Sequence, residues 1–230
     1  MMQLDPQVRR IVTLLPRPEE LTPEAIREQL GRRKAVAVEQ GGRGPAGNSR
    51  LTATTGVVLL ALLALEGATL VSLGPLLPAH VFVGVLLIPP VLLKLASTGY
   101  RFLRYYAGSR AYRLAGPPAT LLRMLGPAVI AATVALFGSG VAMLVLGPGD
   151  GWLVSVHKAS FVVWVIVTAV HVLGHVLHVP GLASADFRAP HARRQGSALR
   201  RAAVAAALVA GLVLAVVAVQ YTAPWQALVG

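Results

Sequence analysis

Hydrophobic residues gather in five long stretches along the chain, separated by polar or glycine-containing connections. The stretches cover about 52–73, 78–99, 120–147, 152–178 and 202–221. Each is near or above the roughly 20 residues that a helix needs to cross about 30 Å of hydrocarbon, and a single buried strand is much shorter. The pattern predicts an all-α integral membrane protein. Its transmembrane domain spans residues 51–221, and a short C-terminal segment, 222–230, follows it.

The connections between these stretches are of two kinds. Residues 74–77 and 147–151 are short and contain glycine, which predicts tight turns. Residues 100–119 and 179–201 are longer, polar and basic, which predicts loops outside the hydrocarbon.

Residues 1–50 form a polar tail that lacks the apolar core of a cleavable signal peptide. Thr22 as an N-cap and Pro23 at the first helical position predict a short helix that reaches about residue 34. The glycine-rich stretch 41–50 predicts a flexible linker into the first span.

Composition narrows the class of protein further. Only 13% of the residues are charged, against roughly 25% in a soluble domain. The chain has no cysteine, which excludes disulfides, thiolate-bound metals and iron–sulfur clusters. A net charge of +12 would suggest nucleic acid on a soluble protein. Here the basic residues lie in tails and loops beside apolar stretches, so the expected partner is the lipid bilayer and no nucleic acid.

The distribution of basic residues predicts the orientation. Nineteen of the 21 lysines and arginines lie in the N-terminal tail, in residues 100–123 and in residues 179–201. By the positive-inside rule these segments face the cytoplasm, which puts the N-terminus inside and the C-terminus outside a cell inner (plasma) membrane. Aromatic residues then mark both interfaces, as Tyr100, Phe102, Tyr105 and Tyr106 on the inner side and Trp152 and Trp225 on the outer side.

Ionisable side chains within the spans are costly in hydrocarbon and therefore point to function. They are Glu66 in the first span, His80 and Lys94 in the second, and His157, His171, His175 and His178 in the fourth. Of the six histidines, only His191 lies in a loop. Leucine or valine would pack in a membrane helix without needing a hydrogen-bond partner, so packing alone does not explain this row of histidines.

The histidines of the fourth span share one helix face. Fourteen residues separate His157 from His171, which is about 40° short of four turns and about 21 Å along the axis. His175 is eighteen residues from His157, or about five turns, and lies on the same line, with His178 about 60° away.

The second and fourth spans both begin at the outer side, and each carries a histidine near that end. His80 and His157 can therefore meet at one level of the bundle. Two histidines on facing helices, with neutral imidazole as ligand, can hold a haem iron from both sides. Gly84, one turn below His80, and Gly138, Ser139 and Gly140 in the third span would leave room for a flat macrocycle.

Two further ionisable residues leave alternatives open. Lys94 lies fourteen residues after His80, where it could ligate a second haem, pair with a haem propionate, contact a quinone or extend to the cytoplasmic interface. Glu66 lies at the depth of the outer histidines, where it could relay a proton, hold a ligand histidine in place or line a polar pocket.

Paired histidines on adjacent helices, with a fourteen-residue step on one of them, resemble the membrane b-type cytochromes. This group includes the cytochrome b subunits that anchor dehydrogenases and hydrogenases, and the ferric-reductase-like transmembrane domains. The resemblance covers residues 52–178, four of the five spans, and the segment HVFVGVLLIPPVLLKLASTGYRFLRYY is similar to small actinobacterial membrane proteins of this kind.

The resemblance implies a four-helix haem-binding bundle plus a fifth transmembrane helix, with one or two b-type haems. It makes His80 and His157 outer iron ligands and His171 an inner candidate, while Lys94 stands where a di-haem member has histidine. The predicted cofactor-binding residues are His80, His157, His171, His175, Lys94, Glu66 and Gly84.

The leading functional hypothesis is transmembrane electron transfer, as the membrane cytochrome subunit of an oxidoreductase. The chain shows no nicotinamide or flavin module, so a quinone or a redox partner protein is expected. The second hypothesis is a proton-coupled transporter or channel that uses Glu66, Lys94 and the histidines of the fourth span; Pro89 and Pro90, which predict a break in the second span, favour it. The third is a non-catalytic membrane anchor or assembly factor.

Overall fold

The computed structural model describes Thr22, Glu24 and residues 44–116, 120–149, 151–176 and 196–229. These ranges are mostly helical and form no strand. The elements are α3 (Pro45–Thr69), η2 (Leu70–Ser72), α4 (Leu73–Tyr106), α5 (Arg110–Leu114), α6 (Thr120–Leu146), α7 (Trp152–Val176), α9 (Ser197–Ala218), η3 (Val219–Tyr221) and α10 (Ala223–Val229).

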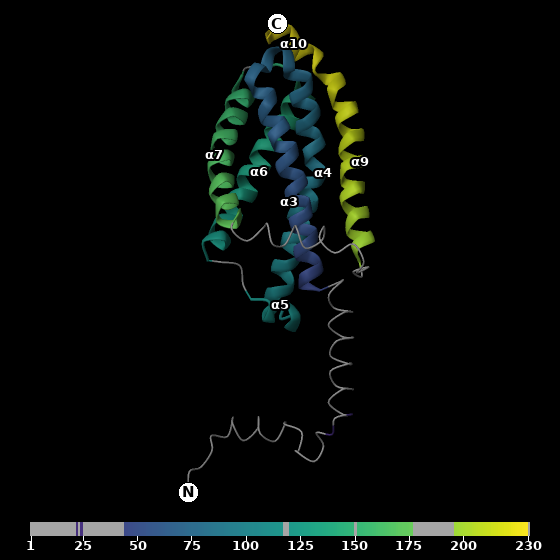
Figure 1. Ribbon diagram of the computed structural model, residues 1–230. Helices are drawn as coiled ribbons and strands as arrows, with labels where there is room; N and C mark the ends of the chain where they lie inside the picture. The colour runs from purple at the N-terminus through teal and green to yellow at the C-terminus, as the bar shows by residue number, and fades with distance from the viewer. Residues whose placement is uncertain are drawn as a thin grey trace.

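Four helical stretches in the described residues are long and apolar enough to cross a membrane, namely Pro45–Tyr106, Met124–Leu146, Trp152–Leu173 and Ser197–Tyr221. The first has 62 residues because α3, η2 and α4 follow one another without interruption. The chain reverses at η2, so that α3 and α4 lie side by side (Figure 1). This stretch therefore holds two of the five predicted apolar segments, and the structure is that of an all-helical membrane protein.

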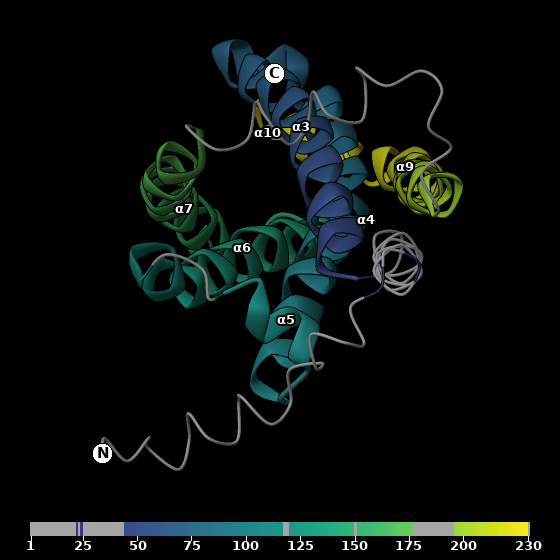
Figure 2. The same ribbon diagram turned by 60° about the horizontal axis from the view of Figure 1, so that its bottom comes forward.

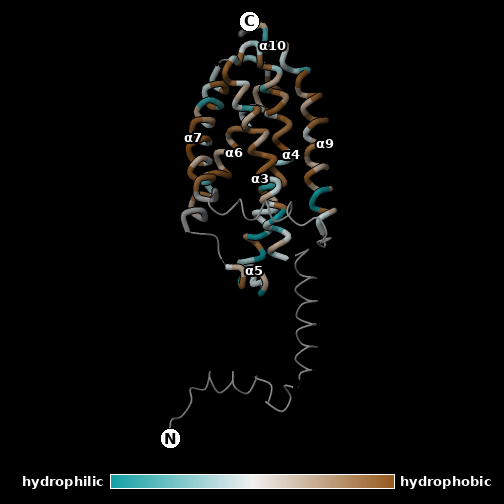
Figure 3. Tube along the Cα trace, in the orientation of Figure 1, coloured by the Kyte–Doolittle hydropathy of each residue, from teal (hydrophilic) through white to brown (hydrophobic). Residues whose placement is uncertain are grey.

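The outward faces of these helices are strongly apolar. Large hydrophobic side chains are exposed along every long helix, among them Leu65, Leu92, Val134, Val163 and Val213. Figure 3 shows hydrophobic residues along the lengths of the helices and hydrophilic ones mainly near α5 and the first turns of α9. Exposed apolar area of this extent is expected where lipid rather than water surrounds the chain.

α4 is the central helix of the bundle. It packs along α3 and α9, while α6 packs along α7 and touches α4 over a short region. Figure 2 shows α6 between α7 and α4, with α9 beyond α4 on the opposite side. No residue of α4 between Leu77 and Val91 is exposed, so protein covers at least part of every side chain in this stretch of the helix.

α9 approaches α4 closely at one glycine. A Cβ atom built on Gly211 would overlap the carbonyl oxygen of Leu86. That carbonyl lacks its usual helical donor because Pro90, four residues later, has no N–H. The small residues Gly211 and Ala215 thus let the backbones of α4 and α9 meet, as small residues do in membrane helix pairs.

Four sequence-based expectations differ from the structure. The predicted break at Pro89 and Pro90 is wrong, because α4 is one continuous helix and Pro90 is fully buried against its neighbours. The predicted linker 41–50 is helical from Pro45, where proline occupies the first helical position and its fixed φ favours a helix start. The first reversal lies at η2 rather than at 74–77, and residues 100–119 contain the end of α4 and all of α5.

Of the other expectations, some agree with the structure and one concerns residues that the structure mostly does not describe. At the predicted turn between α6 and α7, Gly147 and Gly151 both have positive φ. The predicted helix 22–34 lies outside the described residues except for Thr22 and Glu24. The predicted outer side corresponds to the end of the bundle with η2 and α10, called the α10 end below, and the predicted cytoplasmic side to the α5 end (Figure 1).

The close approach of α9 gives a stability test. Gly211→Ala is expected to lower the free energy of unfolding by about 1–3 kcal/mol, because the added methyl group forces the two backbones apart. The apparent Tm of the purified protein in a fixed detergent measures the change. Gly67→Ala is the matched control, since a Cβ on Gly67 has no atom within 4 Å and alanine is the better helix former by about 0.5–1 kcal/mol. Equal Tm values for the two variants would contradict the close contact.

Candidate functional site

The structure brings together the two histidines that the sequence places at one level. His80 in α4 and His157 in α7 have ring centroids 6.4 Å apart, with their planes at 86°. Both side chains are partly buried near the α10 end of the bundle. We call this the imidazole pair.

The surroundings of His80 assign its tautomer. Its Nδ1 lies 2.9 Å from Oε1 of Glu66 and 3.0 Å from the hydroxyl oxygen of Thr69. The Thr69 hydroxyl donates its proton to the backbone carbonyl of Glu66 at 2.6 Å, so toward His80 it can only accept. Both partners therefore accept from a protonated Nδ1, and in the neutral ring the lone pair lies on Nε2.

The surroundings of His157 lead to the same assignment on the opposite helix. Its Nδ1 lies 3.1 Å from the carbonyl oxygen of Leu136, a group that can only accept, and 3.1 Å from the hydroxyl of Ser139. The Ser139 hydroxyl is itself directed at the carbonyls of Ala135 and Leu136. The neutral His157 ring is therefore also protonated on Nδ1 and has its lone pair on Nε2.

Two glycines allow these contacts. A Cβ on Gly140 would lie 3.3 Å from Cε1 of His157, and a Cβ on Gly84 would lie 3.2 Å from Oε1 of Glu66. Gly84 therefore makes room for the Glu66 carboxylate. A Cβ on Gly138 would have no neighbouring atom within 4 Å.

The Glu66 carboxylate is only partly satisfied. Its side chain is 17% exposed, and Oε1 bonds His80. The second oxygen, Oε2, is buried and has no hydrogen-bond partner among the described residues. A buried acceptor without a donor costs free energy, so this oxygen is a candidate position for a proton or a ligand.

Toward the α5 end, Lys94 bonds a backbone atom of α3 rather than extending out of the bundle. Its ammonium donates to the carbonyl oxygen of Thr52 at 2.6 Å. The absence of a side chain on Gly56 leaves room for it, since a Cβ there would lie 3.0 Å from Nζ. One turn further, the Ser97 hydroxyl bonds Thr52 and its carbonyl accepts from Asn48.

The other predicted site residues of the fourth span are less closely placed. His171 is partly buried in α7, close enough to α4 for the charge of Lys94 to act on it. Thr168, one turn before it, has a buried hydroxyl without a partner in the described part of the chain. His175 lies in the last turn of α7, where only the backbone is described, and His178 and His191 lie outside the described residues.

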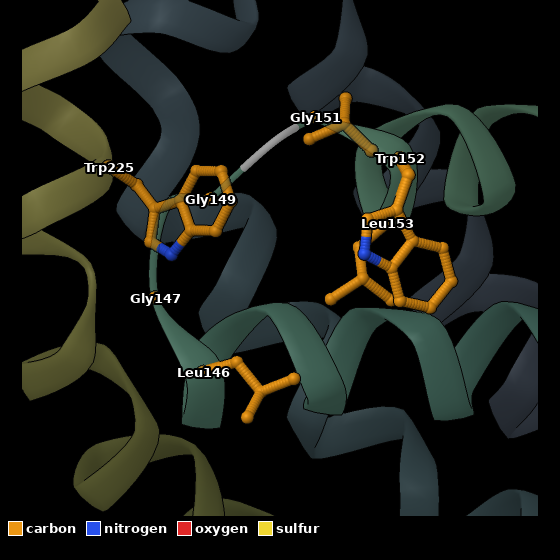
Figure 4. A pocket seen from close by; sticks show the side chains of 8 residues that line it. Leu146, Gly147, Gly149, Gly151, Trp152, Leu153 and Trp225 are labelled. Carbon is orange, nitrogen blue, oxygen red and sulfur yellow. The ribbon is translucent and has the colours of Figure 1, made fainter.

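A further hollow lies at the α10 end of the described residues. It has a volume of about 200 Å³ and lies at the α6–α7 turn, between Trp152 and Leu153 on one side and Trp225 on the other (Figure 4). None of its lining residues belongs to the predicted site. The indole of Trp225 donates to the carbonyl of Met143, which ties α10 to α6 beside this hollow.

Sequence reasoning missed the residues that hold the imidazoles. Thr69 and the Leu136 carbonyl were not singled out, and Ser139 was considered only for its small size. The spacing of Glu66 and Thr69, three residues apart on one helix face, could have indicated that both reach the same partner. The Leu136 carbonyl could not have been found in this way, because every residue has a backbone carbonyl and the sequence does not show which one meets a histidine.

Comparison of the chain with protein-family models, with curated proteins and with solved structures found no match. The described residues also contain no group of three or more His, Cys, Asp or Glu side chains placed to hold a metal ion.

The tautomers give a direct test of the site geometry. In ¹⁵N NMR spectra of histidine-labelled protein without added ligand, the neutral forms of His80 and His157 are expected to carry the proton on Nδ1. Assignment uses the single variants His80→Gln and His157→Gln, each of which removes one signal. A proton on Nε2 of either ring would contradict the hydrogen bonds described above.

Proposed function

We propose that the protein transfers electrons across the membrane through a b-type haem whose iron is bound by His80 and His157. The imidazole pair carries this proposal. Two rings from different helices lie edge-on to each other, each with Nδ1 engaged by acceptors and its Nε2 lone pair without a hydrogen bond in the described part of the chain.

The donor set fits a haem better than a metal ion held by protein alone. A haem iron needs only two axial ligands from the protein, whereas structural and catalytic zinc sites use three or four. The two ring centroids lie 6.4 Å apart, so His80 and His157 would together hold the iron of a bound haem. When bound, haem would supply reversible one-electron chemistry.

The chain's own residues would then tune the site. A ligating histidine commonly donates its other N–H to a carboxylate or carbonyl, which fixes its orientation and raises its basicity. Glu66 and Thr69 stand in this relation to His80, and Leu136 and Ser139 to His157. The apolar side chains of four helices would exclude water from the site, and each nearby charge would therefore have a stronger electrostatic effect on it.

Electrons must also enter and leave the protein, so the proposal includes a quinone or a partner oxidoreductase. Lys94 and His171 would lie on the route toward the α5 end, with His171, His175 or Lys94 as candidates to hold a second haem. The predicted orientation makes this end cytoplasmic.

The spectrum of the purified protein tests the proposal. Protein from a haem-sufficient host is expected to give a sharp b-type band in the reduced-minus-oxidised visible spectrum. His80→Ala and His157→Ala should each abolish the band from the outer haem, because each removes an axial ligand. His191→Ala is the control, since this histidine lies in a predicted loop. Colourless protein, or a band left intact by both ligand changes, would refute the assignment.

The haem-to-chain ratio decides the role of Lys94. A ratio of one leaves no ligand role for this residue, whereas a ratio of two, reduced to one by Lys94→Gln, would assign it to a second haem.

The Glu66–His80 bond predicts the direction of a potential change. Glu66→Gln is expected to raise the midpoint potential, because it removes a negative charge that favours the oxidised iron. A tenfold change in the relative stability of the two oxidation states corresponds to about 59 mV. Redox titration measures the midpoint potential, and Lys94→Gln, which changes a charge fourteen residues after His80 on α4, serves for comparison. A larger shift for Lys94→Gln than for Glu66→Gln would argue against a haem at the imidazole pair.

One observation favours a second function, proton-coupled transport. Among the described residues, Glu66 has a buried oxygen without a donor, and Lys94 has a single hydrogen-bond acceptor for its three protons, so both could exchange protons during a transport cycle. Colourless protein that acidifies or alkalinises liposomes, with the effect lost in Glu66→Gln, would support this function over electron transfer.

A further inference from the structure

Arginines gather where α4 ends and α5 begins, at the α5 end of the bundle. They are Arg101, Arg104, Arg110 and Arg113, and none forms an ion pair with an acidic residue of the described chain. Like charges in one place repel one another. A cluster of this kind is stabilised when an anion binds to it.

The turn between the helices holds two of these side chains, and a third reaches α3. Gly108 has a φ of 85°, which reverses the chain. A Cβ on Gly108 would lie 3.4 Å from Nη2 of Arg113. Arg104 donates to the Ser109 hydroxyl at 3.4 Å, and Arg101 reaches the Ser49 hydroxyl of α3 at 3.5 Å. These bonds are long, so the guanidinium groups keep most of their donor capacity.

Tyr112 of α5 is an independent sign of a ligand at this position. Its side chain is 4% exposed, and its buried hydroxyl has no hydrogen-bond partner in the described part of the chain. The ring packs edge-on against Tyr100, with centroids 6.0 Å apart, and lies beneath the guanidinium of Arg104 at 5.9 Å. A buried hydroxyl without an acceptor costs roughly 1–3 kcal/mol.

The protonation state of Tyr112 suits a donor. Burial and the neighbouring Tyr100 raise the pKa of Tyr112, against the opposing effect of the Arg104 and Arg101 charges. The phenol therefore stays protonated at neutral pH, and its O–H can donate to an anionic oxygen between the arginines.

We infer that this corner, formed by Arg101, Arg104, Arg113 and the Tyr112 hydroxyl, binds the phosphate of an anionic phospholipid. Arg104 and Arg113 are exposed, so they can admit a headgroup. The source of the phosphate is a lipid because the last turns of α4 also expose Phe102, Leu103 and Tyr106. Aromatic and apolar residues beside arginines mark the boundary between hydrocarbon and headgroups.

The test compares single tyrosine variants of the full chain in lipid nanodiscs. Discs of phosphatidylcholine with a minor fraction of phosphatidylglycerol are used, and native mass spectrometry measures how much phosphatidylglycerol stays bound. Tyr112→Phe keeps the ring and every charge, yet removes a hydrogen bond to an anion, so retention should fall about tenfold. Tyr105→Phe, on the same interface, is the matched control and should retain the lipid as the unaltered chain does.

Arginine variants separate the site from general attraction to an anionic surface. Removing any arginine near such a surface weakens lipid binding about fivefold. Arg201→Gln, at the same end of the bundle but on α9, shows this general effect. Arg101→Gln and Arg104→Gln should each lower the retention of phosphatidylglycerol by more than Arg201→Gln does. Circular dichroism in pure phosphatidylcholine discs checks whether Tyr112→Phe folds. If it does not fold, the arginine variants test the proposed site instead.

Two results would overturn the inference. One is equal retention of phosphatidylglycerol by Tyr112→Phe and Tyr105→Phe, because unspecific charge attraction would then be sufficient. If Tyr112→Phe does not fold, equal retention by Arg104→Gln and Arg201→Gln has the same meaning. The other is equal thermal stabilisation of the detergent-purified protein by inorganic phosphate and by short-chain phosphatidylglycerol at the same concentration, because the ligand would then be a soluble anion.

Discussion

Within a lipid bilayer a polar side chain has no water to bond, so its partner must come from the protein itself, and this constraint governs how the helices meet. Several polar residues of the long helices bond a neighbouring helix. α3 and α4 are joined at one end by Glu66 and His80 and at the other by Thr52 and Lys94. α6 and α7 are joined in the same way, through His157 to the Leu136 carbonyl and through the Trp164 indole to Thr133.

Glycines make these polar contacts sterically feasible. Gly56, Gly84 and Gly140 each lie opposite an ionisable side chain of a neighbouring helix, Lys94, Glu66 and His157 respectively. In each case a methyl group would meet the polar atoms at 3.0–3.3 Å. Gly211 has a different role, since it lets the backbone of α9 approach a carbonyl of α4 that proline has left without its helical donor. Packing and polar satisfaction therefore depend on the same few small residues.

The two ends of the bundle differ in chemistry, which separates the two proposals made for this protein. The α10 end holds two imidazoles oriented by acceptors, an arrangement suited to binding a metal through Nε2. The α5 end holds arginines without acidic partners among the described residues and a buried phenol donor, an arrangement suited to an anion. Lys94 and His171 lie between them on α4 and α7. Electron transfer would use the first end and this intermediate region, while lipid binding at the second would fix the bundle's position in the membrane.

The sequence by itself determined where the apolar helices lie, that His157 and His171 share a face, and that His80 and His157 come to one level. Helical periodicity and membrane thickness dictate these features, and both can be read from residue types and spacing. Only the tertiary structure decided that α4 continues through Pro89 and Pro90, that α9 packs on α4, and that Lys94 turns to the Thr52 carbonyl. It also decided which nitrogen of each imidazole is engaged. These outcomes depend on backbone carbonyls and on the space that glycines leave on neighbouring helices, and neither is expressed in the spacing of residues along one helix.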